Sequence, residues 1–216
     1  MSKSPKIILS VKRKQWRKED LAKDEDFEFI KKEKKHLDKN KCLFCGFVSE
    51  KYQESHHVDN NHANNDPSNL VTACPFCHGC YHIGFMGTAG KGKIIYLPEV
   101  SQSELNRIIR VLLVCMHNEA FSMYKLSSER IHEMMLMRAS IVDKEYEEGW
   151  SNPSDFANQL MRLNPVQYAF RSVVSRHLRF LPNYEGFRDQ VDYWGKTMSE
   201  SRPASSWINI VQNSEL

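Results

Sequence analysis

Two Cys-x-x-C pairs constrain the fold of this chain more than any other feature of its sequence. The first pair is Cys42 and Cys45, and the second is Cys74 and Cys77, with residues 46–73 between them. Zinc is bound tetrahedrally by thiolates at about 2.3 Å, and two such pairs supply four sulfurs without straining the backbone. The spacing therefore predicts a structural Zn²⁺ site. Four reduced thiols or two disulfides are the alternative.

The cellular setting bears on that choice. The N-terminal segment is polar and basic, and it lacks the apolar stretch of a secretion signal. No run approaches the roughly 18 apolar residues that a membrane span needs. We therefore expect a cytoplasmic protein without direct membrane insertion, in which paired cysteines bind metal more often than they form disulfides. Cys80 and Cys115 lack a spaced partner, and we expect both to be buried thiols.

Histidines form a second pattern around the cysteines. His78 and His82 are four residues apart and follow Pro75, which favours the start of a helix, so both imidazoles are expected on one helix face. His56 and His57 are adjacent near the end of a predicted strand, where neighbouring side chains face opposite ways. One of them can join a metal while the other reaches toward a substrate. Solvent-facing histidines in a loop are the alternative.

The fold class expected from these patterns is α+β. A short strand is predicted at residues 6–11, a charged helix at 20–39, and a strand at 94–97 after a glycine-rich connection at 84–93. Residues 87–93 spell G-x-x-x-x-G-K, but Ile94 follows where a phosphate-binding loop needs Ser or Thr and a helix.

The second half of the chain predicts helices. They are expected at residues 101–116, 127–148 and 184–198, and after Asn152-Pro153 and Asn164-Pro165. We therefore expect three parts: an N-terminal strand and charged helix at 1–41, a zinc-binding core at 42–97, and an α-helical body at 98–216. The methionine cluster within residues 127–148 suits either an adaptable core or a partner-binding face.

Positive charge lies beside the cysteine segment rather than in it. Residues 1–41 hold fourteen basic and eight acidic residues, whereas residues 42–82 hold one and four, and the remainder is balanced. A basic cluster with Trp16 at residues 12–18 fits nucleic-acid binding, or solvated lysines around a buried tryptophan. Nucleic-acid affinity comes largely from basic side chains against phosphates, so the single basic residue between Cys42 and His82 argues against a nuclease.

The central residues resemble the HNH (ββα-metal) endonuclease family. That family shows a double histidine on the first strand, an Asn-Leu pair nine residues before a helical histidine, and a further histidine four residues later, which match His56, His57, Asn69, His78 and His82. The four paired cysteines resemble those of its zinc-stapled members. The resemblance implies a zinc-stapled ββα core, a catalytic divalent cation bound by His56, His78 and His82, and His57 as general base, oriented by Asn69.

A longer stretch resembles the IcmJ/DotN family of type IVB secretion components. The similarity lies in C-G-F-V-S-E-K-Y-Q-E-S-H-H from Cys45, N-L-V-T-A-C-P-F-C-H-G-C-Y-H from Asn69, and L-P-E-V-S-Q-S-E-L-N from Leu97. It implies a zinc-binding HNH-like adaptor of the cytoplasmic coupling complex, bound to the coupling ATPase that recruits effector proteins and peripheral at the inner membrane. An adaptor is therefore the prediction. A metal-dependent HNH endonuclease that cleaves DNA is the alternative, and only there is nucleic acid a partner.

Overall fold

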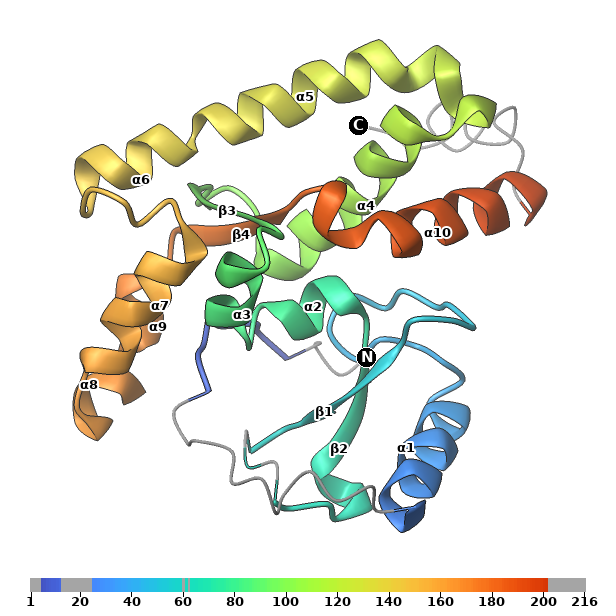
Figure 1. The fold of residues 1–216 in the computed structure, drawn as a ribbon, viewed down its shortest axis with the longest axis horizontal. Coiled ribbons are helices and arrows are strands. Elements are labelled where there is room, and N and C mark those ends of the chain that lie inside the picture. Colours follow the sequence, from blue (N-terminus) through green and yellow to red (C-terminus); the bar gives the residue numbers. More distant parts are fainter. Residues whose placement is uncertain (1–4, 13–24, 60, 62, 202–216) are drawn as a thin grey trace.

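The computed structural model describes residues 5–12, 25–59, 61 and 63–201. It combines helices with two small antiparallel sheets, which confirms the α+β class (Figure 1). The helices of eight or more residues are α1 (Glu25–Leu37), α4 (Gln102–His117), α5 (Lys125–Met137), α7 (Pro153–Arg162) and α10 (Arg188–Ser201). The shorter helices are α2 (Pro75–Gly79), α3 (Ile83–Thr88), α6 (Ala139–Glu145), α8 (Pro165–Ala169) and α9 (Arg171–Val174). The strands are β1 (Glu54–His57), β2 (Leu70–Ala73), β3 (Gly92–Tyr96) and β4 (Leu178–Pro182).

A β-hairpin followed by a helix carries the cysteines and histidines. β1 pairs antiparallel with β2, so that Glu54 lies opposite Ala73 and His57 opposite Leu70. α2 follows β2 directly, and α1 packs on the hairpin from the opposite side, with Asp38 Oδ2 accepting the Thr72 N–H at 3.1 Å. The strand at His56 and His57 and the helix after Pro75 are as the sequence predicts.

The segment at residues 5–12 is not the strand that we predicted. Its alternating apolar side chains, Ile7, Leu9 and Val11, are buried, but they pack beside the turn between α2 and α3. The Ser10 N–H donates to the Cys80 carbonyl at 2.9 Å, and the Ser10 carbonyl accepts the Ile83 N–H at 3.1 Å. The apolar residues of this segment are therefore buried, but the segment pairs with none of the strands in the described part of the chain.

Part of the expected glycine-rich connection is the helix α3. Ile83 and Met86 are buried three residues apart on one face of it. A Cβ on Gly87 would lie 2.1 Å from the Ser154 backbone nitrogen, so this glycine permits the close contact of α3 with α7. The strand expected after the connection is present as β3.

The second half of the chain is not wholly helical, which corrects our prediction. The helix expected from Pro165 stops early, and β4 pairs antiparallel with β3. The helix predicted at residues 127–148 is divided at Arg138, whose carbonyl accepts the Tyr96 N–H at 3.3 Å. At residues 178–182 and at Arg138, hydrogen bonds to β3 therefore replace the helical hydrogen bonds that the local sequence favours. Helices α4 and α7 begin as predicted, at a Ser101–Glu104 capping box and at the Asn152 cap.

A single hydrophobic core joins the cysteine segment to the helices. It includes the four paired cysteines together with Phe76, Phe156, Phe180 and Trp194. Among the described residues, none of the helices combines the length and apolarity that crossing a bilayer requires. Most of the basic cluster, including Trp16, lies outside the described residues, as does the chain from residue 202.

Candidate metal centre

The four paired cysteines converge at the junction of the hairpin and α4. Cys42 and Cys45 lie in a tight turn before β1, in which the Gly46 N–H donates to the Cys42 carbonyl at 2.9 Å and Gly46 adopts a φ of 75°. Such a left-handed conformation favours glycine. Cys74 caps the N-terminus of α2, and Cys77 lies in its first turn. Two local turns therefore present four thiols to one point.

The geometry of this cysteine cluster fits a tetrahedral metal ion. Its four sulfurs all lie within 4.8 Å of one another, and Cys45 Sγ is 3.6 Å from Cys74 Sγ. Thiolates at 2.3 Å from a tetrahedral zinc would be about 3.8 Å apart. All six cysteines are free and buried, so the expected burial of Cys80 and Cys115 is confirmed. The cluster can hold a metal ion such as zinc.

Electrostatics in the cluster favour the thiolate at Cys42 and Cys45 and oppose it at Cys74 and Cys77. Hydrogen bonds from Cys42, Cys74 and Cys77 hold the pKa of Cys45 far below its ordinary value, whereas burial raises the pKa of Cys74. The thiolate is the form that binds metal. The four thiols therefore differ in how readily they ionise. A bound cation would favour the thiolate form of all four.

Helix α4 supplies polar groups to the sulfurs. Arg110 Nη2 lies 3.2 Å from Cys74 Sγ and 3.7 Å from Cys45 Sγ, and Asn106 Nδ2 lies 3.2 Å from Cys77 Sγ. Burial alone would lower the pKa of Arg110, but the negative sulfurs raise it above its usual range. Sequence reasoning missed both residues. Their signal was polarity at positions 106 and 110 on the apolar face of a helix.

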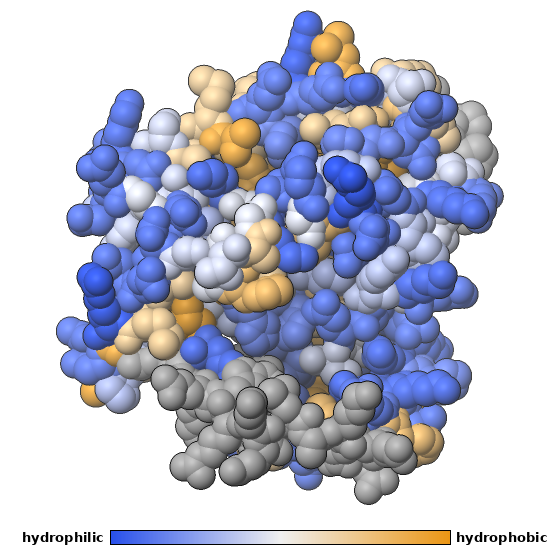
Figure 2. Space-filling model, in the orientation of Figure 1, coloured by the Kyte–Doolittle hydropathy of each residue, from blue (hydrophilic) through white to orange (hydrophobic). Residues whose placement is uncertain are grey.

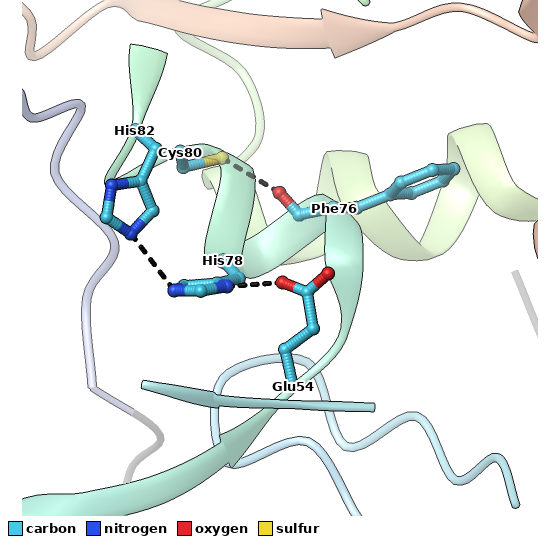
Figure 3. A network of polar contacts seen from close by, with 5 residues as sticks. All are labelled: Glu54, Phe76, His78, Cys80 and His82. Atoms are coloured by element: carbon cyan, nitrogen blue, oxygen red, sulfur yellow. Dashed lines mark hydrogen bonds and ion pairs between the residues drawn. The ribbon is translucent and has the colours of Figure 1, made fainter. Parts of the chain in front are cut away.

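Three histidines form a second cluster on the other end of α2. The candidate ligand atoms of His56, His78 and His82 all lie within 4.8 Å of one another. His78 Nε2 and His82 Nε2 are 3.0 Å apart (Figure 3). α2 ends at Gly79, and a tighter turn, rather than the expected continuous helix, keeps both rings on the same side. The arrangement brings together the three histidines that the family resemblance implies as ligands of a second cation.

Glu54 orients this histidine cluster. Its carboxylate is hydrogen-bonded to His78 Nδ1, which leaves Nε2 facing His82 (Figure 3). A carboxylate partner on the far nitrogen is the usual way in which proteins fix the tautomer of a metal-binding histidine. Sequence reasoning missed Glu54. Its position two residues before His56, on the same side of a strand, was the available signal.

His57 and Asn69 lie away from the three clustered histidines. The His57 ring faces α1, with its centroid 5.7 Å from that of Phe27, and its Nε2 lies 3.0 Å from Asn65 Oδ1. Asn69 Nδ2 donates to Asp59 Oδ1 at 2.9 Å, and the Asn69 carbonyl accepts the Val58 N–H at 2.9 Å. Asn69 therefore holds Val58 and Asp59, the two residues that directly follow β1. The His57 ring, which contacts Asn65 and Phe27, lies on the opposite face of the strand from His56.

A cavity of about 560 Å³ opens beside the histidine cluster. Glu54, His78 and His82 form one wall, and side chains of α3 and α7 form much of the remainder. Lys91, one of its few cationic groups, donates through Nζ to the Gly186 carbonyl at 2.6 Å. The cavity is therefore mainly apolar and offers few charges to a phosphate backbone.

The similarity to known proteins covers both clusters. No family model matches the chain. The Type 4 apparatus protein DotN of Legionella pneumophila subsp. pneumophila (strain Philadelphia 1) is 34% identical over 179 residues. The alignment spans 82% of this chain and 83% of that protein. Similarity of this extent covers the hairpin and most of the helices together, and the chain belongs to the DotN family of type 4 apparatus proteins.

Proposed function

We propose that this protein is a zinc-stabilised adaptor of a type IVB secretion coupling complex, which docks on the coupling ATPase and helps to recruit effector proteins. The observation that carries the proposal is the similarity to DotN, which extends over 82% of the chain and is not confined to the metal segment. As such an adaptor, the protein would act in the cytoplasm, held at the inner membrane only through its complex.

Zinc has a structural role in this proposal. Cys42, Cys45, Cys74 and Cys77 would hold one ion, which would tie the turn before β1 to the start of α2. The hairpin is too short to fold alone, because two strands of four residues bury little surface. The metal would complete the core of residues 42–97, and residues 98–216 would provide most of the partner surface.

The outer side of α5 is our candidate for that surface. Leu126, Met134 and Met137 are 60%, 67% and 74% exposed, and at about 100° per residue they fall within one quarter of the helix circumference. Figure 2 shows hydrophobic residues interspersed with hydrophilic ones in the upper part of the molecule, where α5 lies in Figure 1. Methionine side chains adapt to varied partners, and exposed apolar groups of this kind favour protein contacts.

Charging this surface is expected to weaken binding of the ATPase. The double variant Met134→Glu/Met137→Glu should bind the cytoplasmic domain of the coupling ATPase at least about 30-fold more weakly, which corresponds to roughly 2 kcal/mol of interface energy. Calorimetry or a quantitative pull-down measures the affinity. Phe29→Glu is the matched control, since Phe29 is 65% exposed but lies on α1. Equal loss in both variants, or no loss in the double variant, would contradict the assignment.

A metal-dependent endonuclease is the second candidate, and one observation favours it. His56, His78 and His82 converge, and Glu54 orients His78 as a ligand. A divalent cation there would polarise a scissile phosphate and stabilise the leaving oxygen. His57 would act as general base, but its ring contacts α1 and Asn65 in this structure.

Plasmid cleavage separates the two candidates. With Mg²⁺, Mn²⁺ or Ni²⁺ present, we expect supercoiled DNA to remain intact, because only Lys51 is basic between Cys42 and His82. Gel electrophoresis over several hours measures nicking. Metal-dependent nicking that disappears in the His57→Ala variant would establish the nuclease and contradict an adaptor-only protein.

A further inference from the structure

Arg110 is a buried cation that no carboxylate accompanies within the described part of the chain. Arg110 is 4% exposed. The negative groups beside its guanidinium are the sulfurs of Cys74 and Cys45. A buried charge is expensive unless an opposite charge and hydrogen bonds compensate it. The compensating charge must therefore come from the cysteine cluster.

Aromatic rings hold the guanidinium in place. Its Cζ lies 3.7 Å from the centroid of Phe47, 5.2 Å from that of Trp194 and 5.5 Å from that of Phe76. Arg110 Nε has no hydrogen-bond partner among the described residues. The side chain is thus oriented by stacking, and its Nη2 is the atom that reaches the sulfurs.

The charge of a filled centre matches this arrangement. Four thiolates around a divalent cation carry a net charge of −2, and one arginine neutralises half of it. Asn106 adds a neutral N–H to Cys77 at 3.2 Å. Donors to thiolate sulfur lower its basicity and its nucleophilicity, because they stabilise the negative charge before any reaction.

The donors are distributed unequally over the four ligands. Arg110 and Asn106 serve Cys74, Cys45 and Cys77, whereas no described N–H of α4 reaches Cys42 Sγ. Solvent exposure does not distinguish the ligands, since Cys42 is 1% and Cys45 is 4% exposed. Cys42 does, however, line a second cavity of about 440 Å³, together with Lys34, Asp38 and Arg107.

We propose that Arg110 and Asn106 protect three ligands of the metal centre and leave Cys42 as the ligand at which electrophiles react first. The two residues therefore act as positioning and charge-balancing groups that set how slowly the metal is released. This inference rests on the zinc site of the proposed function. It adds that α4 controls the chemical lability of that site.

N-ethylmaleimide is a suitable probe of this lability. A thiolate sulfur adds to one carbon of the maleimide double bond, the other carbon takes a proton from water, and a neutral thioether results. A thioether is a far weaker zinc ligand than a thiolate, so zinc is released as ligands react. A zinc indicator follows the release, and peptide mass spectrometry identifies which cysteine carries the adduct.

The unmodified protein gives the first test. At low conversion, we expect the adduct on Cys42 in excess over Cys45, Cys74 and Cys77. Adducts that first appear on any of those three, or equally on all four, would overturn the proposal. This measurement needs no variant, so a folding defect cannot obscure it.

Variants on α4 give the second test. Arg110→Met replaces the guanidinium side chain with a shorter, unbranched apolar one. We expect zinc release to be at least about ten-fold faster, with adducts spreading to Cys74 and Cys45, because loss of a hydrogen bond to a charged group is of this size. Arg162→Met is the control for removal of a cation, because Arg162 is exposed at the end of α7 and lines neither the cysteine cluster nor the cavity beside Cys42. If Arg110→Met does not fold, Arg110→Lys should release zinc faster than the wild type, because an ammonium group keeps the charge but not the planar N–H geometry of the guanidinium; an unchanged rate would contradict the role of Arg110.

The two proposals fail in different ways. Protein that contains no zinc when purified would contradict the zinc site itself. Zinc-loaded protein whose release rate is the same in the wild type, the Arg110 variants and the Arg162→Met control would contradict only the role of α4.

Discussion

Replacing Cys74 with serine is expected to abolish zinc binding and the cooperative unfolding transition of the protein. The Cys74 side chain is fully buried and lies 3.6 Å from Cys45 Sγ, so the variant leaves three thiols facing an oxygen. A structural zinc site contributes about 10–16 kcal/mol of apparent folding free energy in small domains. Whole proteins retain a net stability of only about 5–15 kcal/mol. Calorimetry and metal analysis of Cys74→Ser, made side by side with wild type, measure both effects.

Cys80→Ser is the matched control for that experiment. Cys80 is equally buried and follows α2 directly, but it lies outside the cysteine cluster, and its Sγ donates to the Phe76 carbonyl at 3.2 Å. A serine hydroxyl can make the same hydrogen bond, so a loss of about 1–2 kcal/mol and full zinc content are expected. If Cys74→Ser kept its zinc and unfolded at the temperature of Cys80→Ser, the cysteine cluster would not be the metal site.

Phe76→Ala is expected to destabilise the protein by about 3–5 kcal/mol. Phe76 is fully buried in α2, and its ring makes edge contacts with Phe187 and Trp194 at centroid distances of 4.9 and 5.2 Å. The substitution leaves a cavity where the metal segment meets α10. Denaturant unfolding, with wild type measured at the same zinc occupancy, gives the change in free energy.

Phe29→Ala provides the comparison for Phe76→Ala. Phe29 is 65% exposed on α1, so truncation there should change the free energy of unfolding by less than about 0.5 kcal/mol. A single transition in wild type that moves as a whole in Phe76→Ala would show that the metal segment and the helices unfold together. Two separated transitions, of which Phe76→Ala shifts only one, would contradict a shared core.

The parts of the site that could be predicted are those with local spacing. A Cys-x-x-C pair, or two histidines one helical turn apart, brings its ligands together through a few backbone dihedral angles. The starts of α4 and α7 were predictable for the same reason, since Ser101 and Asn152 cap them with neighbouring groups. Local patterns were therefore enough to predict the candidate ligands and the starts of α4 and α7.

The parts that could not be predicted depend on distant contacts. β4 forms because residues 178–182 meet β3, which is more than eighty residues earlier in the chain, and no local pattern distinguishes it from the end of a helix. Arg110 and Glu54 acquire their roles only when α4 reaches the sulfurs and β1 reaches His78. The orientation of His57 toward α1 likewise follows from how the hairpin packs.

The metal content of the purified protein tests the central claim most directly. Mass spectrometry under native conditions, together with elemental analysis, should find one zinc per chain in wild type and in His78→Ala, and none in Cys74→Ser. A second bound metal in wild type that is lost in His78→Ala would assign the histidine cluster as a further site. Zinc-free wild-type protein that unfolds cooperatively, and that is not stabilised by added zinc, would contradict the account.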